Sequence, residues 1–340
     1  MRWNNKGLML AAAAAGALVA MNAGLRRNRH YDLSGRVVLI TGGSRGLGLV
    51  LARQFADEGA QIAICARNAE ELERAKEDLI ERGAGAFTIT ADLTKRDQIE
   101  DMIQRVEERF GGIDVLVNNA GTMQVGPLEA MTIEDFEEAM QVHFWAPLYA
   151  MQAVLPSMRE RGEGRIVNIS SIGGKIAVPH MLPYCASKFA LTGLSQGLRA
   201  ELLKDGIHVT TVCPGLMRTG SPRNAYFKGR NEAEYAWFSV ADSLPGLSMS
   251  AEKAASQIVN ACKRGEAEVI LGLPARAAVL FHGVLPGMAA DLAGFVNTLL
   301  PPPGGIGEQR AHGYESESGA SRTWLTPLSD EAARRNNQIR

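Results

Sequence analysis

Between residues 36 and 271, the hydrophobic pattern alternates between two kinds of segment. One kind is a short, nearly continuous apolar run, which is typical of a strand buried on both faces of a sheet. The other kind repeats its apolar positions every three or four residues, as a helix with one buried face does. The pattern predicts strands at 37–41, 61–66, 86–90, 114–117, 165–169, 209–213 and 268–271, and helices at 47–57, 69–82, 96–110, 132–158, 184–203 and 251–263.

This alternation predicts an α/β fold, because strands that are separated by helices of this length pair in parallel through right-handed crossovers. We expect a Rossmann-like, doubly wound parallel sheet that forms a single domain over residues 34–272. The long helix 132–158 is expected to kink at Pro147, since proline cannot donate the helical hydrogen bond.

The amino-terminal residues 1–33 differ from this domain. Residues 7–25 carry no charge, and as a helix they would reach ~28 Å, enough to cross a bilayer. The run is mostly alanine and glycine, so its insertion is weakly favoured. One interpretation is a membrane anchor that leaves the domain in the cytoplasm. Another is a surface helix on a soluble cytoplasmic protein. A cleaved signal peptide is disfavoured, because residues 21–23 make a poor cleavage site.

The carboxyl-terminal residues also lie outside the alternating pattern. Residues 273–300 predict an amphipathic extension of one or two helices, interrupted at Pro286. Three roles remain open for the extension: a lid over an apolar pocket, a face lying on a membrane, or packing against the domain. Residues 301–340 are polar and rich in glycine and serine, which predicts a flexible tail.

Composition excludes several classes of protein. Apolar residues make up 46% and charged residues 21%, which excludes disorder for most of the chain. With 36 basic and 37 acidic residues the net charge is −1, which argues against a nucleic-acid partner held through phosphates. The four cysteines lie far apart and form no C-x-x-C pair, so we expect neither a disulfide scaffold nor a metal site.

A glycine-rich loop directly follows the first predicted strand. It reads Thr-Gly-Gly-Ser-Arg-Gly-Leu-Gly over residues 41–48 and leads straight into a predicted helix. In that context, backbone N–H groups can approach a pyrophosphate at the positive end of the helix. The sequence therefore predicts a dinucleotide site that includes Gly42, Ser44, Arg45, Gly46, Leu47 and Gly48.

Further motifs follow in order along the domain. Asn-Asn-Ala-Gly stands at residues 118–121, after the fourth strand, and Ser171 stands 13 residues before Tyr184. Lys188 follows four residues after Tyr184, and Pro214-Gly215 precedes Thr219. Together with the glycine loop, this set resembles the classical short-chain dehydrogenase/reductase family over residues 36–271. The resemblance implies cofactor contacts at Asn118, Ala120, Gly121, Tyr184, Lys188, Pro214, Gly215 and Thr219, and at Asp92 and Leu93 near the adenine.

The chemistry that the resemblance implies is the interconversion of a carbonyl and an alcohol. Hydride transfer to a carbonyl leaves a developing alkoxide, to which a tyrosine can supply the proton. A lysine at i+4 lies on the same helix face and can lower the tyrosine pKa with its charge. Tyr184 and Lys188 have that spacing, and Ser171 would orient the substrate oxygen.

Charge at the end of the second strand bears on the choice of dinucleotide. An acidic residue there favours NAD(H), because it binds the ribose hydroxyls, whereas arginine favours the 2′-phosphate of NADP(H). This strand leads into Arg67, and Arg45 lies within the glycine loop. We therefore expect NADP(H), with NAD(H) as the alternative cofactor.

One position departs from the family pattern. The family usually carries an asparagine on the helix after Asn-Asn-Ala-Gly, where it supports a proton-relay water. Here His143 occupies that place. One hypothesis is that His143 keeps the relay and adds pH sensitivity between about 6 and 7. The alternative is a packing role with a weakened relay.

The segment 220–249 is expected to line the substrate pocket and is rich in aromatic residues, namely Tyr226, Phe227, Tyr235, Trp237 and Phe238. This composition favours a small lipophilic substrate, such as a steroid, retinoid, long-chain aldehyde or keto-lipid, although the rings could simply pack the loop. The alternative function is an NADP(H)-binding sensor or scaffold with weakened catalysis. The family tends to form dimers or tetramers, and both appended ends could block a tetramer, so a homodimer is expected.

Overall fold

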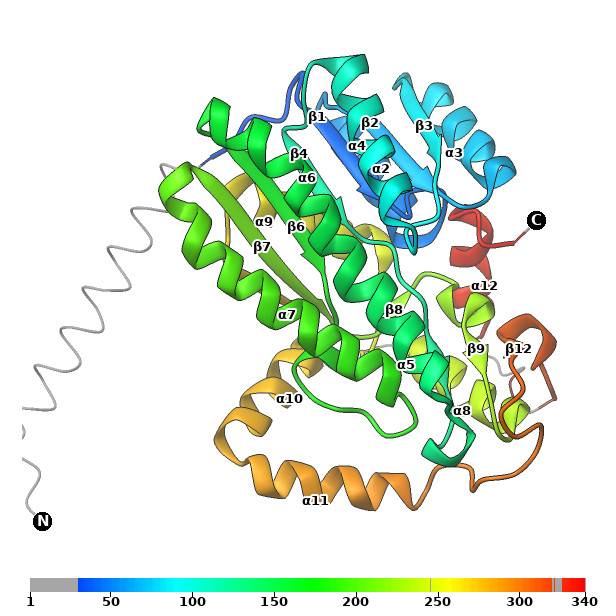
Figure 1. Cartoon of the computed structure of the whole chain (residues 1–340). Helices are drawn as coiled ribbons and strands as arrows, with labels where there is room; N and C mark the ends of the chain where they lie inside the picture. Colours follow the sequence, from blue (N-terminus) through cyan, green and yellow to red (C-terminus); the bar gives the residue numbers. More distant parts are fainter. Residues whose placement is uncertain (1–29, 245, 320, 322–325, 340) are drawn as a thin grey trace, which may run out of the picture.

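The computed structural model describes residues 30–244, 246–319, 321 and 326–339. A seven-stranded, all-parallel sheet forms its centre, in the order β11-β7-β6-β4-β1-β2-β3. Helices cover both of its faces (Figure 1). The expected Rossmann-like doubly wound fold is therefore confirmed. The strands are β1 (Val37–Thr41), β2 (Gln61–Ala66), β3 (Ala86–Thr90), β4 (Val115–Asn118), β6 (Gly164–Ile169), β7 (Ile207–Pro214) and β11 (Glu268–Leu271).

The predicted helices come at the expected places, with ends that differ by a few residues, whereas the helices at 231–243 and 326–335 were not predicted by the periodicity. They are α2 (Gly46–Asp57), α3 (Ala69–Glu81), α4 (Arg96–Phe110), α5 (Ile133–Met140), α6 (Ala146–Arg161), α7 (Leu182–Leu202), α8 (Asn231–Ser243), α9 (Ala251–Arg264), α10 (Leu273–Val284), α11 (Pro286–Asn297) and α12 (Thr326–Arg335). Short strands are β5 (Gln124–Val125), β8 (Met217–Arg218), β9 (Tyr226–Phe227), β10 (Met249–Ser250) and β12 (Ala311–His312).

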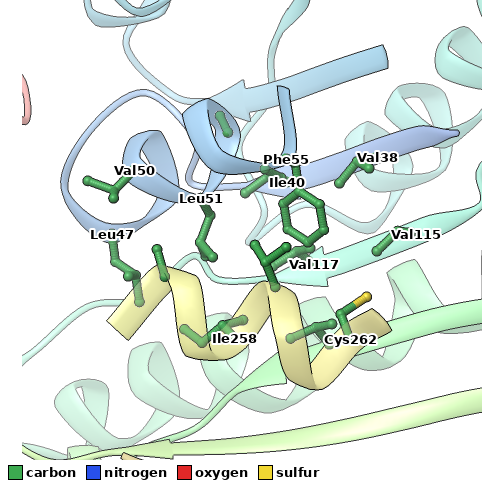
Figure 2. Packing of buried hydrophobic residues seen from close by; sticks show 14 of the residues in the cluster. Val38, Ile40, Leu47, Val50, Leu51, Phe55, Val115, Val117, Ile258 and Cys262 are labelled. Atoms are coloured by element: carbon green, nitrogen blue, oxygen red, sulfur yellow. The ribbon is translucent and has the colours of Figure 1, made fainter. Parts of the chain in front are cut away.

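Each face of the sheet has its own apolar core. On one face, α2 and α9 pack on β1 and β4, where Phe55, Val38 and Ile258 are buried together (Figure 2). On the other face, α4 and α6 bury Ile103 and Val154 against the sheet. Burial on both faces explains why the strands read as continuous apolar runs rather than as alternating ones.

The long helix predicted at 132–158 is interrupted where the kink was expected. A wider π-helical turn, Gln141–Trp145, joins α5 to α6 just before Pro147. Proline has no N–H to donate, so the regular hydrogen-bond pattern cannot run through it. His143 lies within this turn, and its side chain is buried.

The prediction of a flexible tail over residues 301–340 is wrong for the part that the structure describes. Residues 311–312 pair as β12 with β9 in a three-stranded sheet that also contains β5. Asn336, beyond the end of α12, is fully buried. A polar, glycine-rich composition fits a mobile tail, but here hydrogen bonds to the domain hold the segment in place.

The predicted extension 273–300 is a pair of helices, α10 and α11, with a break at Pro286 as expected. The expectation that this extension packs against the domain is contradicted for most of the length of the two helices. Ala275 is the one residue of α10 and α11 that is buried. Large apolar side chains on both helices are exposed, and Leu273 (78%) and Phe295 (60%) are examples. We call residues 273–300 the apolar hairpin; it projects below α7 (Figure 1).

Candidate active site

The glycine loop lies at the carboxyl end of β1, where it enters α2. Gly42 takes a left-handed conformation (φ 65°), and a Cβ on it would stand 2.9 Å from Ala120 Cα. The helix begins after Arg45, which gives no side-chain cap. The first amides of α2 therefore take their partners from outside the helix, as a phosphate-binding turn requires.

The Asn-Asn-Ala-Gly turn packs directly on this loop. The Asn119 side chain donates hydrogen bonds to the Thr41 and Gly42 carbonyl oxygens at 3.0 and 3.1 Å. The Ala120 N–H donates to Thr41 Oγ1 at 3.1 Å. Asn118 donates to Asn168 Oδ1 at 2.8 Å, which ties β4 to β6. The two motifs therefore form one surface at the carboxyl edge of the sheet.

The predicted catalytic set comes together on β6 and α7. Ser171 follows β6, and its hydroxyl accepts the Gly173 N–H at 3.0 Å and lies near enough to the Tyr184 phenol to lower its pKa. Lys188 Nζ lies 5.7 Å from the centre of the Tyr184 ring. It donates to the Ile169 carbonyl oxygen at 2.8 Å. One turn of helix thus separates a phenol from a buried amine, as the spacing predicts.

The electrostatics of this pair differ from the expectation. Burial raises the pKa of Tyr184 to about 12 and outweighs the hydrogen bond from Ser171. Burial also lowers the pKa of Lys188 to about 7. The expected lowering of the tyrosine pKa by Lys188 is therefore not found. Tyr184 is a neutral phenol at neutral pH, which is the form that can donate a proton.

His143 links the Asn-Asn-Ala-Gly turn to α7. Its Nε2 accepts the Thr122 N–H at 3.1 Å, so the ring proton of the neutral form lies on Nδ1. Nδ1 lies 2.8 Å from Ser187 Oγ, which in turn donates to the Tyr184 carbonyl oxygen at 2.9 Å. The imidazole also meets the Tyr184 ring edge-on, with centroids 5.5 Å apart. His143 thereby holds the turn and the tyrosine helix at a fixed separation.

The hypothesis that His143 titrates between about 6 and 7 is contradicted. Complete burial, reinforced by the charge of Lys188, holds its pKa well below 6.5. Both ring nitrogens already have protein partners, Thr122 and Ser187, so neither is left for a relay water. The packing alternative is the one that these contacts favour.

We expect His143→Asn to leave the pH–rate profile between pH 6 and 7 unchanged, because the imidazole is neutral over that range. The shorter amide cannot reach both Thr122 and Ser187, so kcat should fall by about 5- to 30-fold, which corresponds to ~1–2 kcal/mol of lost transition-state stabilisation. Steady-state rates across pH 5–9 measure both effects. Ser187→Ala is the matched variant, and it should lower kcat in the same way. If the pH–rate profile shifts in His143→Asn, the measurement would instead support the hypothesis that His143 titrates in this pH range.

At the predicted adenine end, Arg45 and Arg67 have different surroundings. Arg45 Nη1 lies 3.2 Å from Glu71 Oε1 and donates to Asn224 Oδ1 at 3.0 Å, whereas Arg67 is exposed at the end of β2. Burial opposes ionisation of Asp92, but hydrogen bonds from Thr94, with help from Arg67, lower its pKa. Glu71 was not identified from the sequence, because it reads as part of a charged helix face.

The remaining predicted cofactor residues lie along the same edge. Leu47 and Leu93 are buried, each 8% exposed. Pro214 ends β7, and Gly215 packs against Ala275 of the apolar hairpin, where a Cβ would stand 3.0 Å from the Ala275 methyl group. Thr219 is buried and hydrogen-bonded to Ser221 at 2.6 Å.

The aromatic segment 220–249 contributes to a third apolar cluster. Phe227, Tyr235 and Phe238 are buried in it, and the partly buried Trp237 and Tyr184 pack against it. These rings therefore pack the segment together and also back the catalytic phenol with an apolar wall. Tyr226 instead contacts the ring of His312 in the carboxyl-terminal segment in a tilted arrangement, with centroids 4.6 Å apart.

Comparison with known proteins agrees with this geometry. A sequence model of the family described as short chain dehydrogenase matches residues 36–227. A dehydrogenase/reductase SDR family protein 7-like of Anopheles gambiae is 38% identical over 275 residues, which cover 79% of this chain and 84% of that protein. The chain therefore belongs to the short-chain dehydrogenase/reductase family and is an oxidoreductase.

Solved structures extend the comparison to the fold. A short-chain dehydrogenase from Streptomyces avermitilis has a TM-score of 0.67 and 32% identity, and the match covers 78% of this chain and 98% of that one. A gluconate 5-dehydrogenase from Burkholderia cenocepacia, solved in complex with NADP and tartrate, has a TM-score of 0.64 and 29% identity. That match covers 73% of this chain and 98% of the other.

The membrane anchor predicted at residues 7–25 lies outside the described residues. Among the helices that the structure does describe, none combines the length and the apolar character needed to span a membrane.

Proposed function

We propose that the protein is an NADP(H)-dependent reductase or dehydrogenase that interconverts a carbonyl and an alcohol on a lipophilic substrate. The observation that carries the proposal is the grouping of three side chains: Lys188 Nζ lies 5.7 Å from the centre of the Tyr184 ring, and the Ser171 hydroxyl acts on the Tyr184 phenol. Ser171 and Tyr184 would together bind the substrate oxygen. A bound nicotinamide supplies or accepts the hydride.

The residues of the glycine loop and its surroundings fit such a cofactor. The uncapped start of α2 offers backbone donors to a pyrophosphate, and the glycine loop leaves room for its approach. Arg45 and Arg67 supply positive charge for a 2′-phosphate, which supports NADP(H) over NAD(H). Glu71 beside Arg45 partly offsets that charge, which keeps NAD(H) as the second cofactor to be tested.

The proton steps follow from the ionisation of Tyr184 and Lys188. In the reductive direction, the neutral Tyr184 phenol donates its proton to the developing alkoxide. Lys188, whose pKa burial lowers to about 7, is the nearby group that can return a proton to the phenolate that this leaves. A phenol pKa of about 12 makes the phenolate scarce at neutral pH, so these residues favour reduction over oxidation.

Two features support a lipophilic substrate that is reached from a membrane surface. The wall behind Tyr184 is apolar and aromatic, with Phe227, Tyr235 and Phe238 at its centre. The apolar hairpin follows β11 directly, so it begins at the same carboxyl edge of the sheet as Ser171. Its exposed apolar side chains suit the boundary of a lipid bilayer. We therefore propose a membrane-associated enzyme whose catalytic domain lies in the cytoplasm.

The experiment that tests the proposal follows NADPH consumption by the full-length protein with a panel of ketones and aldehydes of increasing chain length. Carbonyls are offered in solution and in phosphatidylcholine vesicles. We expect kcat/KM to rise with apolar chain length and to fall about 10²- to 10⁴-fold in Tyr184→Phe, because the proton donor is lost. NADH measured in parallel checks the cofactor preference.

Two results would count against the proposal in different ways. Equal turnover by Tyr184→Phe would exclude Tyr184 as the proton donor. NADPH binding without turnover of any carbonyl, or of the matching alcohols with NADP⁺, would favour a sensor or scaffold. A preference for short polar carbonyls would retain the enzyme and overturn the lipophilic substrate.

A further inference from the structure

The carboxyl-terminal end of the described chain lies on the glycine loop. We call residues 331–339 the carboxyl-terminal strap; it contains the end of α12 and the residues after it. The Gly46 N–H, in the first turn of α2, donates to the Asn336 carbonyl oxygen at 2.8 Å. The Asn337 side chain donates to the Ser44 carbonyl oxygen at 2.9 Å. The strap therefore contacts the loop that the sequence predicts to bind a pyrophosphate.

The contacts of the strap extend to both sides of this loop. Towards α3, Asn337 Nδ2 donates to the Glu71 carbonyl oxygen at 3.0 Å and Asn337 Oδ1 accepts from Arg74 Nε at 2.8 Å. Towards the substrate segment, Asn224 donates to Gln338 Oε1, and Gly220 packs closely on Ala333. The strap thus joins the predicted adenine end of the cofactor site to the substrate segment, and α12 lies beside α3 in Figure 1.

The strap is held by burial as well as by hydrogen bonds. Asn336 and Ala333 are fully buried. Arg53 of α2 donates to the Asn336 side chain at 3.1 Å and to the Arg335 carbonyl oxygen at 2.9 Å. An arrangement with this many specific partners is a docked segment and not a loose end.

The strap and a dinucleotide need the same donors. A phosphate at this loop accepts hydrogen bonds from the first amides of α2, and the Asn336 carbonyl already accepts from Gly46. The Gln338 amide would lie 2.5 Å from a Cβ on Gly46, so it fills the approach to that amide. The Asn336 carbonyl oxygen thus occupies the Gly46 donor that a phosphate oxygen would otherwise accept from. The side chain of Arg335 is 3.8 Å from Glu252 of α9, so its charge faces away from the loop.

We propose that the glycine loop has two alternative ligands: NADP(H) and the chain's own carboxyl-terminal strap, which must leave before the dinucleotide binds. The inference rests on cofactor binding at this loop, as proposed above. The strap acts as an intramolecular competitor, so the apparent affinity for NADP(H) is the intrinsic affinity multiplied by the fraction of molecules with the strap released. Any partner or modification that holds the strap away would raise activity at low cofactor concentration.

The test uses full-length variants that loosen the strap without touching the amides of α2. Asn337→Ala removes the contacts to Ser44, Glu71 and Arg74 together. We expect it to lower the Kd for NADPH by about 10-fold, since each lost hydrogen bond weakens the closed state by a modest amount. Arg74→Ala removes only the hydrogen bond from Arg74 to Asn337, so it should lower the Kd for NADPH by a smaller factor than Asn337→Ala does. Arg334→Ala, at an exposed position of α12, is the control and should leave the Kd unchanged.

Hydrogen exchange supplies a readout that does not depend on turnover. The Gly46 amide should be protected in the protein alone and should exchange faster in Asn337→Ala, because its partner Asn336 is released. Saturating NADPH should speed exchange across residues 331–339 while slowing it at Gly46. If NADPH instead protects the strap, or if Asn337→Ala weakens NADPH binding, the strap is part of the cofactor site and the competition is overturned.

The outcomes separate this inference from the proposed function. An unchanged Kd for NADPH in Asn337→Ala would overturn the competition between strap and cofactor, but it would not count against the proposed reductase function. A lowered Kd for NADPH in Asn337→Ala, without turnover of any carbonyl, would support competition by the strap and overturn the proposed reductase function. Failure of the natural protein and of Asn337→Ala to bind either NADPH or NADH overturns both.

Discussion

Replacing Lys188 with methionine is expected to lower carbonyl turnover about 10²- to 10⁴-fold while making the folded protein more stable. The loss of activity follows because methionine cannot return a proton to the Tyr184 phenolate formed after proton donation. The gain in stability follows because Lys188 is buried, at 4% exposure, and its contacts within the described residues are the Ile169 carbonyl oxygen and the Tyr184 ring, neither of which is a carboxylate. Methionine has a similar length and no charge to desolvate.

The stability gain should depend on pH in a defined direction. Burial lowers the pKa of Lys188 from 10.5 to about 7, so the unfolded chain holds this proton more tightly than the folded protein does. The resulting destabilisation is complete below about pH 7 and disappears as the pH rises towards 10.5. Lys188→Met should therefore raise the Tm most at pH 6 and progressively less at pH 8 and 9.

Thermal unfolding at these pH values, together with kcat at saturating NADPH, measures both effects. Lys204→Met is the matched control, because Lys204 is exposed after the end of α7. It should change neither the activity nor the pH dependence of Tm. A Tm difference between Lys188→Met and the natural protein that stays constant from pH 6 to 9 would contradict a lowered pKa at Lys188.

Much of the fold could be predicted because it depends on local periodicity. The apolar runs that become β1 and β4 are buried on both faces, and the helices between the strands follow the same signal. The candidate catalytic set could also be predicted, since Tyr184 and Lys188 lie on one helix at a spacing that fixes their common face. Ser171 was predicted from its match to the family pattern, and in the structure its hydroxyl acts on the Tyr184 phenol.

The features that the sequence did not predict depend on tertiary contacts. The environment of His143 is set by Thr122 and Ser187, which lie 21 residues before and 44 residues after it in the chain. Burial among these partners, and not the residue type, decides its ionisation. Neither Asn336 nor Asn337 stood out, because single asparagines in a polar segment give no signal until their partners on the glycine loop are known.

The packing of Gly48 links the fold to cofactor binding. An added Cβ would lie 2.6 Å from Asn119 Nδ2 and closer still to the Gly42 carbonyl oxygen. Asn119 Nδ2 is the donor that joins the Asn-Asn-Ala-Gly turn to the glycine loop. Even one methyl group at position 48 must therefore push these two motifs apart.

Gly48→Ala is accordingly expected to weaken NADPH binding at least about 100-fold and to lower the free energy of unfolding by ~1–3 kcal/mol. Fluorescence titration with NADPH and urea unfolding measure the two effects. Gly193→Ala on α7 is the control: a Cβ there meets no atom within 4 Å, so helix propensity alone should stabilise the fold by ~0.5–1 kcal/mol. Because the strap also uses this loop, Gly48→Ala should in addition expose residues 331–339 to exchange. Undiminished NADPH binding in Gly48→Ala would mean that the pyrophosphate is held elsewhere.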